Sequence, residues 1–226
     1  MRTFLTFITG VLIATSAQAI ALADLSNKDA SGGLKEALTQ GAGKAVATLG
    51  RPDGFLGNPK VRIPLPGNLE KASGMMHKLG MGKQADELEV AINRAAEAAV
   101  PQAKTLLVNA VKQMSVEDAK GILTGGEDSA TQYFRRTTAA PLGEKFKPIV
   151  RATIAKVGLA QKYDQFAGKA AKFGLVKEED ARMENYVTQK ALDGLYLMIA
   201  EEEKSIRQNP AQAAGKLARK VFDVLK

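Results

Sequence analysis

The sequence has no cysteine, no tryptophan and a single histidine in 226 residues. The missing cysteines exclude disulfides, thiolate metal sites and thiol redox catalysis. A hydrolytic triad could be built only around His77, and no G-x-S-x-G nucleophile elbow accompanies it. A phosphate loop is not expected either, because Glu127 and Asp128 follow the Gly125-Gly126 pair and would repel a phosphate.

The sequence also lacks a hydrophobic run of the roughly 20 residues that span a bilayer. Its most apolar stretch, Phe4–Ala14, follows Arg2 and precedes small residues that end in an A-x-A pattern at 17–19. This is the layout of a secretory signal peptide. We therefore expect residues 1–19 to be a cleaved signal peptide, although a second A-x-A at 21–23 would move cleavage as late as residue 23. The mature chain is then a periplasmic protein with no transmembrane segment.

Aromatic residues make up only 5% of the chain, and apolar residues recur at helical spacing almost throughout. The prediction is an all-α fold, with residues 24–226 forming a single compact multi-helix domain. Pro141 is expected to separate two helices, and Pro148 to kink or divide the second. The expected helices cover residues 34–49, 68–80, 83–99, 101–114, 115–123, 127–138, 142–157, 159–173, 177–207 and 211–225.

Prolines and glycines are concentrated in residues 51–67, which we call the arm. Prolines at this density preclude a regular helix and predict extended backbone. Its apolar side chains would be unfavourable in water, so they either cover the helical core or dock on a partner. The candidate interaction residues of the arm are Arg51, Asp53, Phe55, Leu56, Ile63 and Leu65.

A polar cluster is expected on the helix at 83–99, where Glu89, Asn93 and Glu97 share one face and Arg94 reaches Glu97. Two carboxylates could act as general acid and base, or could bind a hard cation. The alternative is a polar network that fixes how this helix meets its neighbours. We favour the structural interpretation.

A second polar cluster contains the candidate ligand contacts Thr131, Tyr133, Arg135 and Arg136. Arginine can hold an anionic group through two parallel hydrogen bonds. Adjacent arginines cannot share a helix face, however, and arginine often forms plain surface ion pairs.

A weak metal candidate is the group Met76, His77 and Met81, because thioether and imidazole ligands suit copper(I). Methionines more often fill irregular gaps in a core, and Lys78 places a positive charge within the group. We expect no metal and no other cofactor.

The chain carries 32 basic and 24 acidic residues, for a formal net charge of +8. This surplus suits an anionic partner. The basic residues are spread along the chain. They do not alternate with aromatic residues as in proteins that bind single-stranded nucleic acid, so nucleic acid is not expected as a partner. The expected partner is an envelope protein or an anionic or amphipathic small molecule, and the oligomeric state stays open.

Several phrases resemble one bacterial family, domain-of-unknown-function family 4197. They are Gly33–Leu38 (GLKEAL), Arg51–Leu56 (RPDGFL), Ile63–Pro66 (IPLP), Asn93–Ala99 (NRAAEAA) and Asp118–Gly125 (DAKGILTG). The resemblance implies an exported helical protein of the cell envelope and brings no established activity, cofactor or catalytic residue.

Three functions remain open. The first is a non-enzymatic binding or scaffold protein of the envelope, which an exposed apolar patch beside the arm would favour. The second is a carrier of a lipid or other amphipathic ligand, which requires an apolar cavity with Arg135 or Arg136 at its mouth. The third is a hydrolase or lyase, which requires Glu89 and Glu97 to line one open cleft.

Overall fold

The computed structural model describes residues 27–67, 70, 77, 82–156, 158, 160–161, 163–164, 182–213 and 215–223. Within these ranges the regular secondary structure is helical throughout, which confirms the all-α prediction. The expected signal peptide lies outside the described residues. The elements are α2 (Asn27–Leu49), α4 (Gly82–Ala99), η1 (Val100–Gln102), α5 (Ala103–Gln113), α6 (Val116–Thr124), α7 (Ser129–Ile154), α9 (Met183–Gln208), η3 (Pro210–Gln212) and α10 (Lys216–Asp223).

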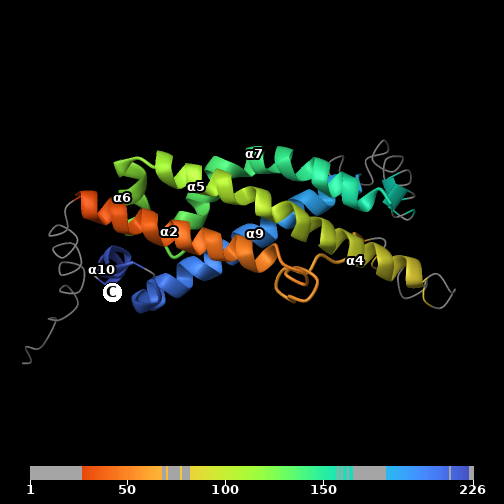
Figure 1. The fold of residues 1–226 in the computed structure, drawn as a ribbon, viewed down its shortest axis with the longest axis horizontal. Coiled ribbons are helices and arrows are strands. Elements are labelled where there is room, and N and C mark those ends of the chain that lie inside the picture. The colour runs from red at the N-terminus through yellow and green to blue at the C-terminus, as the bar shows by residue number, and fades with distance from the viewer. Residues whose placement is uncertain are drawn as a thin grey trace, which may run out of the picture.

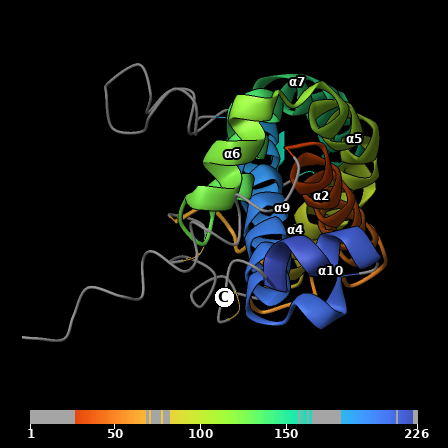
Figure 2. The same ribbon diagram turned by 90° about the vertical axis from the view of Figure 1, so that its left-hand side faces the viewer.

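The helices form an elongated bundle in which α9 packs against α7, α4 and α2 (Figure 1). The end-on view of Figure 2 shows α6 and α10 at one end of this bundle. The helix α9 is held there because Val187, Ala191, Leu195 and Ile199 recur every four residues and are all buried. Each large apolar side chain that is fully buried contributes about 1.5–3 kcal/mol.

The expected break at Pro141 is wrong, because α7 runs from Ser129 to Ile154 without interruption and includes both Pro141 and Pro148. A proline inside a helix removes one hydrogen bond and costs about 3 kcal/mol or more. Burial on the same helix offsets this penalty. The side chains that provide it are Leu142, Phe146, Val150 and Ile154, spaced four residues apart.

The ends of the chain also differ from the prediction. The helix α2 begins at Asn27 rather than near residue 34, and within the described residues α10 covers Lys216–Asp223 after the short turn η3. The two helices pack closely at Gly33, where an added Cβ would lie only 2.6 Å from the carbonyl oxygen of Leu217. Glycine at this position therefore lets α10 close one end of the bundle against α2.

None of the helices in the described ranges combines the length and the apolar composition that a membrane span needs.

Candidate functional site

The arm lies between α2 and α4 in the chain, and its apolar side chains are part of the core. Phe55, Ile63 and Leu65 are buried, whereas Leu56 is half-buried and Arg51 and Asp53 are exposed. The ring of Phe55 contacts the backbone of α9, where a Cβ on Gly194 would lie 2.7 Å from the Phe55 Cε1 atom. The large apolar groups of the arm therefore cover the helical core and do not form an exposed patch.

The carboxylate of Glu97 holds one end of the arm. Its Oε1 atom accepts hydrogen bonds from the backbone N–H groups of Phe55 (3.1 Å) and Leu56 (3.2 Å). Its Oε2 atom accepts from Arg94 at 2.6 Å, and Arg94 also donates to Asp53 of the arm at 2.8 Å. These two acceptors, Glu97 first, raise the pKa of Arg94 above its ordinary value.

Asn93 holds the other end of the arm. Its Oδ1 atom accepts from the N–H of Ile63, and its Nδ2 atom donates to the carbonyl of the same residue, both at 2.8 Å. One helical turn earlier, Glu89 accepts from the Arg62 side chain at 2.8 Å. The row Glu89, Asn93 and Glu97 on α4 therefore binds the arm at two places, the turn at Phe55–Leu56 and the segment at Arg62–Ile63.

This geometry supports a structural role for the first polar cluster. Glu97 is 5% exposed and its oxygens are occupied by three donors, whereas Glu89 forms an ion pair at the surface. The two carboxylates do not line a common open cleft, which the acid–base hypothesis requires.

The second polar cluster separates into buried and exposed groups. Thr131 is buried, and both its N–H and its hydroxyl donate to Glu203 at 2.9 Å. Glu203 also accepts from the N–H of Ala130 (3.0 Å) and pairs with Arg207 (2.9 Å). A carboxylate at this position satisfies the free N–H groups of the α7 N-terminus and interacts with the helix dipole. Thr131 is thus committed to an internal contact with Glu203, a residue that the sequence did not single out.

Arg135 and Arg136 extend from α7 toward different neighbours. Arg135 stacks over the ring of Tyr196 at 4.7 Å and pairs with Asp193 of α9 at 3.3 Å. Arg136 stacks over Tyr133 at 5.5 Å and pairs with Asp118 of α6 at 3.2 Å. Each arginine therefore lies in a separate surface groove.

The groove between α6 and α7 has a volume of about 450 Å³ and contains Arg136. Its polar groups are largely bonded to one another: Gln132 donates to Asp128, and the Ser129 hydroxyl donates to a nearby carbonyl. The Tyr133 hydroxyl donates to the carbonyl of Ala110 at 2.7 Å, and burial raises its pKa. This groove leaves few polar groups for a ligand.

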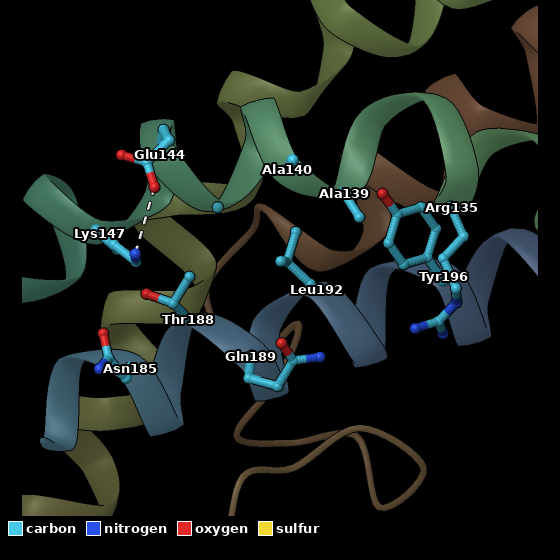
Figure 3. Close-up of a pocket in the computed structure, with 11 residues that line it drawn as sticks. Arg135, Ala139, Ala140, Glu144, Lys147, Asn185, Thr188, Gln189, Leu192 and Tyr196 are labelled. Atoms are coloured by element: carbon cyan, nitrogen blue, oxygen red, sulfur yellow. Dashed lines mark hydrogen bonds and ion pairs between the residues drawn. The ribbon is translucent and has the colours of Figure 1, made fainter. Parts of the chain in front are cut away.

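The groove between α7 and α9, which we call the α7–α9 groove, has a volume of about 520 Å³ (Figure 3). One wall comes from α7 and the other from residues of α9 at helical spacing, and both face the opening. The lining residues are Arg135, Ala139, Ala140, Gly143, Glu144, Lys147, Asn185, Thr188, Gln189, Leu192 and Tyr196.

Thr188 is the unusual residue of this groove. It is buried, and its Oγ1 atom has no hydrogen-bond partner among the described residues. Five other helical threonines donate to the carbonyl four residues earlier; they are Thr39, Thr124, Thr137, Thr138 and Thr153. A buried hydroxyl without a partner costs about 1–3 kcal/mol, so such groups are rare and need an explanation.

The charges in the α7–α9 groove are compensated. Lys147 lies 3.3 Å from the Glu144 carboxylate, and Arg135 is paired with Asp193. Gln189 donates to Asp193 at 3.1 Å, whereas the Asn185 amide has no bond to any described residue. The groove therefore offers the Asn185 and Gln189 amides rather than an uncompensated charge.

Tyr196 closes one end of the α7–α9 groove. Its hydroxyl lies 2.8 Å from the Thr138 hydroxyl, and burial raises its pKa above the ordinary value. The phenol is therefore neutral near neutral pH and fixed in position, which suits a wall better than an acid or base.

The metal candidate is only partly within the described residues, because Met76 and Met81 lie outside them. The exposed ring of His77 lies 3.3 Å from the carboxylate of Asp86. Within the described ranges, no three His, Cys, Asp or Glu residues are grouped so that they could hold a metal ion.

The sequence predicted one residue of the α7–α9 groove, Arg135, and missed Asn185, Thr188 and Gln189. A signal was present, since these three polar residues share one face of a single helix.

Comparison with known families gives one match. The model of a family described as a protein of unknown function (DUF4197) matches residues 24–223. No curated protein and no solved structure is similar enough to match the chain.

Proposed function

The chain belongs to the DUF4197 family, whose description gives no activity, and we propose from the candidate site and the N-terminal sequence that it is a non-enzymatic binding protein of the bacterial cell envelope. The signal-peptide layout of residues 1–19 supports export to the periplasm. The family match begins at residue 24, after this expected leader, which agrees with a mature chain that starts there.

The proposed binding site is the α7–α9 groove, and one observation carries it. The groove contains a buried hydroxyl, that of Thr188, which has no partner in the described part of the chain. The Oγ1 atom is closed off from solvent, so a ligand seated in the groove would supply the missing donor or acceptor once the Thr188 side chain turned toward it. Ligand sites commonly combine a preformed hollow with a few polar groups that fix orientation.

The carrier hypothesis is less well supported. Arg135 does stand at the groove, as that hypothesis requires, but the apolar part of the lining is limited to Leu192, the Tyr196 ring and three small residues. A lipid chain would need a larger apolar surface to offset the loss of its own membrane environment. The groove therefore favours a polar ligand.

The experiment is native mass spectrometry of the protein purified from its own periplasm, with a variant that fills the groove. Ala140 is exposed and lines the groove, so Ala140→Trp should block it without disturbing the core. Ala152→Trp is the matched control, because Ala152 is an exposed alanine of the same helix that does not line the groove. The intact mass also gives the cleavage site, which is expected after residue 19 or as late as residue 23.

We expect a bound species on the wild type and on Ala152→Trp, and its loss from Ala140→Trp. Equal retention by both tryptophan variants would place the ligand elsewhere. A clean mass for all three proteins, or an uncleaved leader in the cytoplasm, would contradict the proposal. A bound lipid would revive the carrier hypothesis.

A further inference from the structure

We infer that one exposed face of α7 binds the surface of an anionic lipid bilayer through its basic side chains. The surface, which we call the basic face, consists of Lys145, Pro148, Arg151, Ala152, Ala155 and Lys156. All six residues are exposed, and none of them lines the α7–α9 groove. The inference therefore concerns a second surface and does not depend on a ligand in the groove.

The part of the chain that contains this face has almost no acidic residues. Residues 135–156 carry six basic side chains and a single acidic one, that of Glu144. The basic residues are Arg135, Arg136, Lys145, Lys147, Arg151 and Lys156. Although basic residues occur along the whole chain, acidic residues accompany them elsewhere and are scarce here. Much of the formal net charge of +8 therefore arises from this one stretch.

Several of these cations have partners within the protein, but the two lysines of the basic face do not. The paired residues are Arg135 with Asp193, Arg136 with Asp118, Lys147 with Glu144, and Arg151 with Glu184. Lys145 and Lys156 form no hydrogen bond or ion pair with any described residue. Glu184 is shared between Arg151 and Arg182, so it compensates only one of these two charges. The described residues therefore leave positive charge uncompensated on this face.

The two unpaired lysines lie along one line of the helix. They are eleven residues apart, which is about three helical turns and about 16 Å along the axis. Lys156 follows the end of α7 directly, where the C-cap residue Ala155 keeps helical backbone angles. The helix α7 runs along one long edge of the elongated bundle (Figure 1). The lysines are therefore exposed on a side of the bundle that can lie along a membrane surface.

The residues between the cations favour a lipid surface over a protein partner. Pro148, Ala152 and Ala155 offer neither a polar side chain nor a large apolar anchor. Protein interfaces depend on such anchors, among which tryptophan and tyrosine are prominent. An anionic headgroup layer requires only basic side chains near its surface, each of which strengthens binding. Because large apolar side chains are missing from the face, we expect it to lie on the headgroups rather than insert among the acyl chains.

The test is cosedimentation of the mature protein with vesicles made of phosphatidylglycerol and phosphatidylcholine in equal parts. We expect binding to these vesicles, no binding to phosphatidylcholine alone, and release at high salt because salt screens the attraction. The double variant Lys145→Ala, Lys156→Ala should bind about 25-fold more weakly, since each basic side chain near an anionic surface contributes about fivefold.

The double variant Lys216→Ala, Lys220→Ala is the matched control. Both residues are exposed lysines of α10, which lies on the opposite side of the bundle from α7 (Figure 2). The control loses the same charge and should bind the vesicles about as well as the wild type, and circular dichroism should show that both double variants are folded. An equal loss of binding in the two would mean that overall charge attracts the vesicles, which would overturn the inference.

A tryptophan placed on the basic face gives a second readout. The chain has no tryptophan, so the tryptophan emission of Ala152→Trp reports on this position alone. We expect this emission to move to shorter wavelength when anionic vesicles are added, because the indole ring settles at the membrane interface. Ala47→Trp, at an exposed alanine of α2, should show no such shift. Equal shifts at the two positions, or binding to polyglutamate without binding to the vesicles, would contradict the inference.

Discussion

Two rows of polar residues at four-residue spacing differ in what covers them. They are Glu89, Asn93 and Glu97 on α4, and Asn185, Gln189 and Asp193 on α9. On α4, Asn93 is buried because the arm lies over it, and its amide is bonded to the Ile63 main chain. On α9, Asn185 is only half-buried and its amide has no described partner. Similar residue types at the same spacing therefore bind the arm on α4, whereas on α9 Gln189 and Asp193 bond to each other and only Asn185 is without a described partner.

The largest expected effect comes from removing the carboxylate that holds the arm. Glu97→Ala leaves two N–H groups of the arm without their acceptor and leaves the Arg94 guanidinium with Asp53 alone. Breaking a buried charged network of this kind lowers the free energy of unfolding by about 3 kcal/mol. Urea denaturation should show this loss, whereas Glu89→Ala, which removes only a surface ion pair, should cost less than about 1 kcal/mol.

The two asparagines give the most direct comparison. Asn93→Ala removes both bonds to the Ile63 peptide unit and should lower the free energy of unfolding by about 2 kcal/mol. Asn185→Ala removes no described bond and should change stability by less than about 0.5 kcal/mol. Equal losses in urea denaturation would show that the α9 row is as structural as the α4 row.

Two helical glycines sharpen the same contrast. Gly194→Ala places a methyl group 2.7 Å from the Phe55 ring, which should displace the arm and cost about 1–3 kcal/mol. Gly143 lies in the open groove, where its nearest side-chain neighbour would be 4.0 Å from an added Cβ. Gly143→Ala should therefore stabilise the helix by up to about 1 kcal/mol. Thermal unfolding of the two variants should shift in opposite directions.

The smallest effect is expected at Thr188. Thr188→Val replaces an unpaired buried hydroxyl with a methyl group, so it should raise the free energy of unfolding by up to about 1 kcal/mol. Thr138→Val should do the reverse, because that hydroxyl is bonded to Tyr196 and to a backbone carbonyl. A loss of stability in Thr188→Val comparable with that in Thr138→Val would mean that the Thr188 hydroxyl has a structural partner.

Local patterns in the sequence predicted much of the fold. Apolar residues at helical spacing located α4 and α9, and the helix expected over 115–123 corresponds to α6, where Ser115 and Asp118 form both bonds of a capping box. These features depend on residues within one or two turns of one another. The helix break expected at Pro141 is wrong because packing against other helices stabilises α7 beyond this residue. No local sequence pattern records that packing.

The candidate site was less predictable for the same reason. The α7–α9 groove joins Arg135 to Asn185, which are fifty residues apart in the chain, and only packing brings them together. In the sequence, the polar cluster of α4 and the arm look like separate features. In the structure, hydrogen bonds of Glu97 and Asn93 join them. Whether a polar residue meets its own chain or an open groove depends on tertiary contacts.

The position of Tyr196 has an optical consequence. The chain has no tryptophan, so tryptophan fluorescence does not mask the near-ultraviolet emission of its four tyrosines. One of them, Tyr196, forms a wall of the α7–α9 groove and lies beneath the Arg135 guanidinium at 4.7 Å. A molecule that enters the groove must disturb this stacked pair or shield it from water. The unlabelled protein therefore carries its own fluorophore at the groove, and its tyrosine emission can report occupancy during a titration.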